Sequence, residues 1–326
     1  MPKQFLLQFC ALVVLFCFTG CYPDPPEIKE VSNQVSSAQI YAVCYPLQFA
    51  AQQLVGDELN VQFIGPPAGE SVVDWRPDRA DVLAMQSADV IVTNGIGAQY
   101  ADWLLTVSIP ESKLCNTASR ALKLRDFIQV DDVEIVHTHG PEGEHSHPLT
   151  VSHTWLDPAM FQKQVNYLAD QLKIQYPDQN DSIETSRKTL TDQLDVLVDK
   201  TEKLKKSLAG AKVITASPKL KFLTRSLGLD DLHLNLKSSD PVDDQVDQVK
   251  KFWSGLDPKV RPKWILFPGF SPDTQLETFL NELGLGVAVL DTVESQIKNM
   301  NYFSRTSANL DLIESSLQPA SPSKSD

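Results

Sequence analysis

The sequence predicts an α/β protein of two doubly wound lobes, each with a mostly parallel sheet, joined by one long helix. Three observations lead to this prediction. Short apolar runs alternate with helical periodicity across residues 38–175, the same alternation returns across residues 211–312, and one long amphipathic stripe lies between them. Strands alternating with helices at this spacing are typical of parallel sheets covered by helices. Some three hundred residues suit two ordinary domains.

The first twenty residues predict an export signal. Lys3 precedes an almost wholly apolar run, residues 5–18, which is short for a transmembrane helix. Thr19-Gly20-Cys21 follows and resembles the lipobox of bacterial lipoproteins. We therefore expect residues 1–20 to be a lipoprotein signal peptide, Cys21 to be lipidated, and the polar, proline-containing residues 21–37 to be a tether. The alternatives are an ordinary signal peptide cleaved nearby and an uncleaved anchor.

The N-terminal lobe, residues 38–175, begins with alternating strands and helices. Pro46 suits the first turn of a helix, and Asn94-Gly95 suits a turn after a compact buried strand. We expect strands at residues 40–44, 59–64 and 89–93, and helices at residues 46–54 and 77–85.

One helical stripe dominates the linking segment, residues 176–210. Its apolar or small positions repeat at intervals of three, four and seven and are Ile183, Leu190, Leu194, Leu197, Thr201, Leu204 and Leu208. Asp181 and Glu184 resemble a capping box, and Gly210 suits the end of the helix. At 1.5 Å per residue such a helix is about 40 Å long, enough to join two lobes rigidly.

The C-terminal lobe, residues 211–312, repeats the α/β pattern. We expect strands at residues 212–216, 264–267 and 287–290, and helices at residues 220–227 and 275–283. The Ser- and Pro-rich residues at the end of the chain, 313–326, predict a disordered tail.

The net charge excludes some classes of binding partner, and the cysteine content limits the number of disulfides. The net charge of −13 argues against binding to nucleic acid and against adhesion to anionic lipid. Beyond Cys21 the chain has only Cys44 and Cys115, which could form one disulfide in an oxidising compartment or remain separate.

Histidines are concentrated in one segment. Five of the six lie within residues 137–153, namely His137, His139, His145, His147 and His153. The first four form two His-x-His pairs in a loop of glycine, proline and glutamate that is too polar to pack in a core. Imidazoles gathered beside carboxylates suit divalent ions such as zinc. The alternative is a solvated loop that binds nothing specifically.

His153 has a different setting. In His153-Thr154-Trp155-Leu156-Asp157-Pro158, Asp157 suits an N-cap and Pro158 the first helical residue. His153 is therefore expected just before a helix, at the sheet edge where ligands collect in α/β folds. A single histidine there is more often structural than a ligand.

Several short motifs follow one another along this sequence. They are Cys44-Tyr45-Pro46-Leu47, Gly65-Pro66-Pro67, Asp74-Trp75-Arg76-Pro77, Asn94-Gly95-Ile96-Gly97, His153-Thr154-Trp155-Leu156-Asp157-Pro158 and Leu290-Asp291. In this order they resemble the motifs of the ZnuA-like, cluster A-I family of solute-binding proteins of zinc and manganese ABC transporters. The histidine-rich loop and the long helix are features of that family as well. The resemblance implies a protein that captures a divalent metal ion between two lobes.

The resemblance also implies four metal ligands, of which this sequence retains two. His153 and Asp291 match family ligands, whereas Val73 and Ser217 stand where the family has histidines. The glutamate of the family's Phe-Glu-Pro motif is missing from Phe267-Pro268-Gly269. Either Glu70, Asp74 or the loop histidines substitute, or the protein is a divergent relative with altered metal affinity.

The leading hypothesis is therefore a lipid-anchored binding protein on the periplasmic or extracellular face of the membrane. It would deliver zinc, or next manganese, to an ABC permease and its ATPase, and act as a monomer without catalysis or nucleic acid. A surface metal-buffering or adhesin-like protein is the alternative. A metallohydrolase has little support, because the sequence has neither His-Glu-x-x-His nor Gly-x-Ser-x-Gly.

Overall fold

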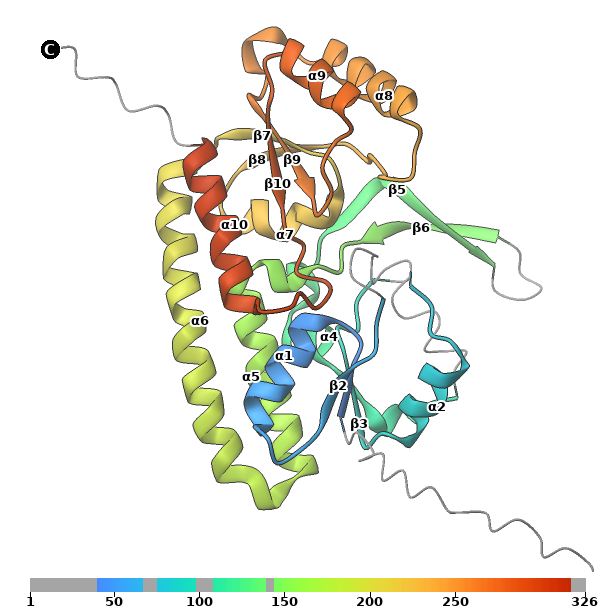
Figure 1. Ribbon diagram of the computed structural model, residues 1–326, viewed down its shortest axis with the longest axis vertical. Coiled ribbons are helices and arrows are strands. Elements are labelled where there is room, and N and C mark those ends of the chain that lie inside the picture. Colours follow the sequence, from blue (N-terminus) through green and yellow to red (C-terminus); the bar gives the residue numbers. More distant parts are fainter. Residues whose placement is uncertain (1–39, 67–74, 98–107, 139–143, 318–326) are drawn as a thin grey trace, which may run out of the picture. The chain divides into compact units, whose positions relative to one another are not determined.

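The computed structural model describes residues 40–66, 75–97, 108–138 and 144–317, without the side chains of residues 131–138 and 144–149. The predicted signal peptide, the tether and Cys21 lie outside the described residues. Two four-stranded parallel sheets with surrounding helices and one long helix confirm the predicted α/β class (Figure 1). No helix among the described residues is long and apolar enough to cross a membrane.

The first sheet has the strand order β2-β1-β3-β4, and all its pairs are parallel. Its strands are β1 (Ile40–Ala42), β2 (Val61–Phe63), β3 (Val90–Thr93) and β4 (Leu114–Asn116). The helices of this half are α1 (Tyr45–Val55), α2 (Arg79–Ser87), α4 (Thr117–Ala121) and α5 (Pro158–Gln175). Strand β3 is buried along its whole length, as its uninterrupted apolar run predicts.

The second sheet has the order β10-β9-β7-β8 and is also parallel throughout. Its strands are β7 (Lys212–Thr215), β8 (Asp230–His233), β9 (Trp264–Pro268) and β10 (Gly286–Leu290). The helices of this half are α7 (Lys221–Ser226), α8 (Val242–Gly255), α9 (Thr274–Glu282) and α10 (Tyr302–Leu317). Residues 313–317 therefore belong to a helix, with Ile313 fully buried, and the expected tail does not begin at residue 313.

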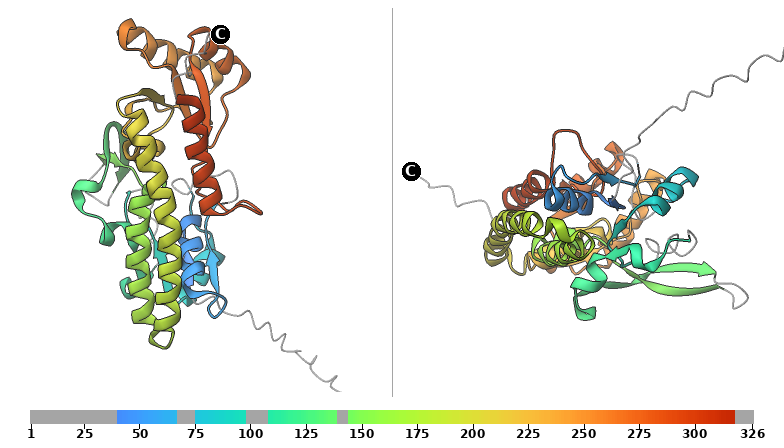
Figure 2. Two further views of the ribbon diagram at one scale, coloured as in Figure 1. Left: turned by 90° about the vertical axis from the view of Figure 1, so that its left-hand side faces the viewer. Right: turned by 90° about the horizontal axis from the view of Figure 1, so that it is seen from below.

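Helix α6 (Asn180–Leu208) is 29 residues long, and its buried positions are the seven of the predicted stripe. It runs beside α5 and contacts α1 and α10 as well, so one helix packs against elements of both halves (Figure 2). The predicted capping box is wrong: Gln179 is the N-cap without a side-chain hydrogen bond. Glu184 instead contacts Lys173 and Arg187.

Residues 129–138 and 144–150 form two paired strands, although the sequence predicted a histidine-rich loop over residues 137–153. Strand β5 (Gln129–Thr138) pairs antiparallel with β6 (Glu144–Thr150), and the two form a ribbon of their own, separate from either parallel sheet (Figure 1). The glycines and prolines of the segment predicted irregular structure, but alternating Val, Ile and Thr positions in β5 suit a strand.

Cys44 and Cys115 are both buried and are not joined by a disulfide. Burial raises the pKa of the Cys115 thiol to about 12, so its reactive thiolate is disfavoured at neutral pH. We expect a thiol reagent to modify Cys115 very slowly at pH 7.5 in the native protein, and completely after unfolding in guanidinium. Rapid modification of Cys115 in the native protein, located by mass spectrometry, would contradict this expectation.

Candidate metal site

His153 lies immediately before a short 3₁₀ helix, η4 (Thr154–Leu156), that leads into α5. The Asp157 carboxylate accepts hydrogen bonds from the amides of Ala159 (3.0 Å) and Met160 (3.2 Å), which confirms Asp157 as the N-cap of α5. Trp155 is fully buried and donates its indole N–H to the Thr292 carbonyl at 2.8 Å. His153 is therefore held by a fixed backbone that is tied to the segment following β10.

The turn after β3 supports His153 from the other side. Asn94 follows β3 and its amide nitrogen donates to the Ser152 carbonyl, while Thr154 donates its hydroxyl to the Asn94 side-chain oxygen at 3.1 Å. Gly95 lets the turn pack closely against the end of β4: its φ is +72°, and a Cβ there would lie 2.7 Å from Asn116 Cβ. The predicted Asn-Gly turn thus fixes the backbone on which His153 stands.

The imidazole of His153 meets a carboxylate from the second half of the chain. Its Nε2 lies 2.8 Å from Oε1 of Glu294, and the side chains are 2% and 5% exposed, respectively. Nζ of Lys219 lies 3.2 Å from the same oxygen. The His153 and Lys219 side chains therefore contact the same buried oxygen atom of Glu294.

Burial governs the protonation of His153. Loss of solvent lowers its pKa, and this effect outweighs the opposing effect of the nearby Glu294 carboxylate. A lowered pKa favours the neutral imidazole, whose Nε2 donates to Glu294 in the tautomer that carries the proton on that nitrogen. In the other neutral tautomer, Nδ1 would carry the proton and face Ser152 Oγ at 3.3 Å, which would leave the Nε2 lone pair available to a metal ion.

Glu294 reaches the site through an unusual backbone conformation. Val293 has a φ of +57°, a region that β-branched residues rarely adopt. The Val293 amide donates to the Asp291 carboxylate at 2.7 Å, and the Tyr45 amide donates to the Glu294 carbonyl at 3.2 Å. The chain thus turns between Asp291 and Glu294, and the turn is anchored to the start of α1.

Lys219 follows β7 in a second 3₁₀ helix, η6 (Pro218–Leu220). Ser217 caps this turn, since its hydroxyl accepts from the Lys219 amide at 3.4 Å. Lys219 and Glu294 therefore follow the carboxyl ends of the parallel strands β7 and β10, where α/β folds place ligands. His153 follows the antiparallel strand β6, and its neighbours Ser152 and Thr154 are hydrogen-bonded to Asn94 at the carboxyl end of β3.

Asp291 has a different partner from the one the sequence suggested. Its two carboxylate oxygens accept from Nε and Nη2 of Arg305, both at 2.6 Å. The Arg305 side chain is 2% exposed and that of Asp291 is 30% exposed. Bidentate pairing of this kind neutralises the carboxylate and fixes its orientation.

The histidine-rich segment is described only through its backbone. His137 in β5 pairs with His145 in β6, and His147 pairs with Ile135. His139, Glu70 and Asp74 lie outside the described residues, so their roles as ligands stay predictions. Among the described residues, no three His, Cys, Asp or Glu side chains form a group that could hold a metal ion.

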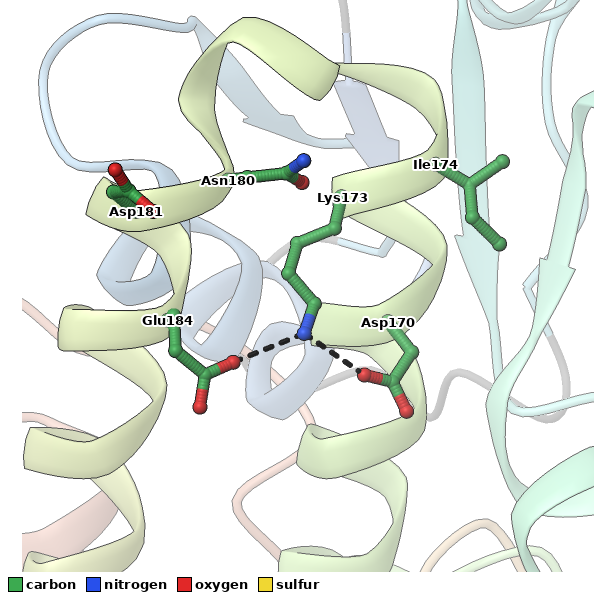
Figure 3. Close-up of a pocket in the computed structure, with 6 residues that line it drawn as sticks. All are labelled: Asp170, Lys173, Ile174, Asn180, Asp181 and Glu184. Atoms are coloured by element: carbon green, nitrogen blue, oxygen red, sulfur yellow. Dashed lines mark hydrogen bonds and ion pairs between the residues drawn. The ribbon is translucent and has the colours of Figure 1, made fainter.

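A separate hollow of about 550 Å³ lies where α5 ends and α6 begins. It is lined by acidic and basic side chains, and Lys173 bridges Asp170 at 3.3 Å and Glu184 at 2.9 Å across it (Figure 3). The described side chains of this hollow form no group of three His, Cys, Asp or Glu residues that could hold a metal ion.

Sequence reasoning missed Glu294, Lys219 and Arg305. Glu294 stands three residues after the Asp291 of a recognised motif, so an acidic residue beside the motif was the available signal. Lys219 stands two residues after Ser217, the position that lacks the family's histidine. No periodicity could assign either residue to the site, because each lies in a short segment after a strand, Lys219 in the 3₁₀ helix η6 and Glu294 in a turn.

Comparison with known proteins places this chain in a family. The sequence profile of the family described as ZnuA, zinc-uptake complex component A, periplasmic, matches residues 40–316. The high-affinity zinc uptake system protein ZnuA of Bacillus subtilis is 25% identical over 331 residues, which cover 96% of each chain. The zinc-binding lipoprotein AdcA of Streptococcus pneumoniae is 24% identical; the match covers 97% of this chain and 61% of AdcA.

A solved structure agrees with the fold. The solute-binding protein FpvC of Pseudomonas aeruginosa in complex with Mn²⁺ superposes with a TM-score of 0.66 at 21% identity, covering 86% of this chain and 99% of FpvC. The match of the family profile spans most of the sequence and both parallel sheets. The chain therefore belongs to the ZnuA family of solute-binding proteins.

Proposed function

We propose that this protein captures a divalent metal ion, zinc first and manganese next, and delivers it to an ABC permease and its ATPase subunit. The observation that carries the proposal is the 2.8 Å contact between His153 Nε2 and Glu294 Oε1 near the ends of strands from both sheets. The zinc-related names of the B. subtilis and S. pneumoniae relatives and the Mn²⁺ complex of FpvC support the choice of ions.

The chemistry of the pair suits such an ion. Neutral imidazole and carboxylate are ordinary zinc ligands, and a shift of the His153 proton to Nδ1 makes Nε2 a ligand without changing the charge. Two protein ligands leave further coordination positions to water, or to Glu70 and Asp74 as the sequence suggests. The histidines of the β5–β6 hairpin would act as a second, looser collecting site. Capture and release need no catalytic step.

The location of the protein is part of the proposal. We expect acylation of Cys21 to hold the folded part at the outer face of a membrane, with residues 21–37 as a spacer. The lipoprotein name of AdcA and the periplasmic description of the family support this placement. A monomer is expected, with the permease as its protein partner.

A second candidate function is surface metal buffering or adhesion without delivery to a transporter. The pairing of Asp291 with Arg305 and of Glu294 with Lys219 favours it, because both carboxylates already have cationic partners. Copurification of the permease and ATPase with the tagged protein would support delivery. Zinc binding without such partners would favour buffering.

Titration of the purified, metal-free protein with zinc tests the proposal. We expect one tight equivalent that disappears in His153→Ala and survives in His233→Ala, which removes an imidazole from strand β8 instead. Deletion of residues 137–147 should remove only weaker, additional binding. Unchanged affinity in His153→Ala would exclude His153 as a ligand, and loss of all binding on deletion would assign the metal to the hairpin.

A further inference from the structure

Lys219 places its positive charge beside the Glu294 oxygen that a metal ion would need as a ligand. Its Nζ lies 3.2 Å from Glu294 Oε1, the oxygen that also accepts from His153 Nε2 at 2.8 Å. We infer that the Lys219 ammonium is a tethered competitor for the metal ion, so that metal binds between His153 and Glu294 only by displacing it. This inference rests on the proposed function, and it assigns to Lys219 the control of metal affinity at the His153–Glu294 site.

Burial explains why a cation is needed there. The Glu294 side chain is 5% exposed, and a carboxylate removed from water is costly unless a partner compensates its charge. A hydrogen bond from imidazole satisfies one lone pair, whereas the ammonium supplies the opposite charge. A divalent ion would supply it equally well, so loading exchanges one cation for another at the same oxygen.

The geometry of Lys219 suits displacement. Its side chain is 27% exposed, whereas those of His153 and Glu294 are almost wholly buried. The backbone of η6 is capped by Ser217 and does not need to move, because the lysine stem has four rotatable carbons. Rotation of the stem can therefore move the ammonium away from Glu294 without movement of the η6 backbone.

Sequence context agrees with this role. Ser217, two residues earlier, stands where the resemblance expects a metal-ligating histidine. A serine hydroxyl is a weaker metal ligand than an imidazole, and a cationic side chain follows in the same turn. Both features would weaken the binding of a metal ion between His153 and Glu294.

Zinc affinity of purified, metal-free variants, measured by competition with a chelating indicator, tests the inference. We expect Lys219→Met to bind zinc at least tenfold more tightly than the native protein, Lys219→Arg to bind like the native protein, and Lys219→Met/His153→Ala to lose the gain. Lys212→Met is the matched control, because it removes a lysine from an exposed pair with Asp230. Lys219→Gln serves as a second variant if Lys219→Met melts at a lower temperature.

The outcomes separate this inference from the proposed function. If Lys219→Met and Lys219→Gln both bind zinc no more tightly than the native protein, and native binding depends on His153, the inference is overturned and the proposed metal capture stands. A gain in Lys212→Met as large as in Lys219→Met also overturns it, because general charge would then suffice. Binding that appears only in Lys219→Met supports the inference and contradicts metal capture by the native chain. If zinc binding depends on His153 neither in the native protein nor in Lys219→Met, the inference and the proposed function are both overturned.

Discussion

Replacing Asp291 with alanine should lower the free energy of unfolding by about 3 kcal/mol and weaken the zinc affinity of the folded protein far less than loss of the Glu294 carboxylate does. Arg305 is 2% exposed and directs Nε and Nη2 at the Asp291 carboxylate. Removal of one partner of a buried ion pair leaves an uncompensated charge, which costs about 3–5 kcal/mol, and the partial exposure of Asp291 places this case at the lower end. Denaturant unfolding and zinc titration measure the two quantities.

A double variant distinguishes charge from packing. Asp291→Ala/Arg305→Met should recover part of the lost stability, because it removes the unpaired guanidinium and keeps an apolar side chain in its place. The opposite pattern, full stability with loss of zinc binding in Asp291→Ala, would show that Asp291 is the metal ligand that the sequence suggested.

Replacing Glu294 with glutamine should lower zinc affinity by more than about 100-fold. Glutamine keeps the size of the side chain but loses the negative charge that faces His153 and Lys219. Removal of the hydrogen-bonding partners of metal ligands alone costs about 10–100-fold in affinity, so loss of an anionic ligand should cost more. Competition with a chelating indicator at constant pH provides the measurement.

Glu282→Gln is the matched control for this variant. Glu282 is exposed on α9, so its replacement removes the same charge from the surface and should leave zinc affinity unchanged. Native affinity in Glu294→Gln would remove Glu294 from the site and return the carboxylate role to Asp291, Glu70 or Asp74.

The periodicity of apolar residues predicted well those helices and strands in which burial repeats regularly along the chain. The seven stripe positions from Ile183 to Leu208 are the buried residues of α6, because residues three, four or seven apart lie on the same face of a helix. Strand β3 and the Asp157 cap were equally readable, since both depend on neighbouring residues. The paired strands β5 and β6 could not be predicted, because the polar composition of the segment hid its β-strand pattern.

The metal site was predictable only in part. His153 could be placed because Asp157-Pro158 fixes the start of α5 beside it. The motif led to Asp291, but a carboxylate is a ligand only if no stronger partner holds it, and Arg305 approaches from a helix that begins eleven residues later. Glu294 depends on the positive φ of Val293, which no residue preference indicates.

Helix α6 limits how a loaded protein can differ from an empty one. A swinging closure between halves needs a few linker residues that absorb large backbone rotations. Most of the crossing between the sheets is the 29 residues of unbroken helix α6, which also contact α1, α5 and α10, so residues 180–208 contain no such pivot. Recognition of the loaded state would then depend on the turns that carry His153, Lys219 and Glu294, and an ammonium group moved outward would itself be a signal that a transporter could read.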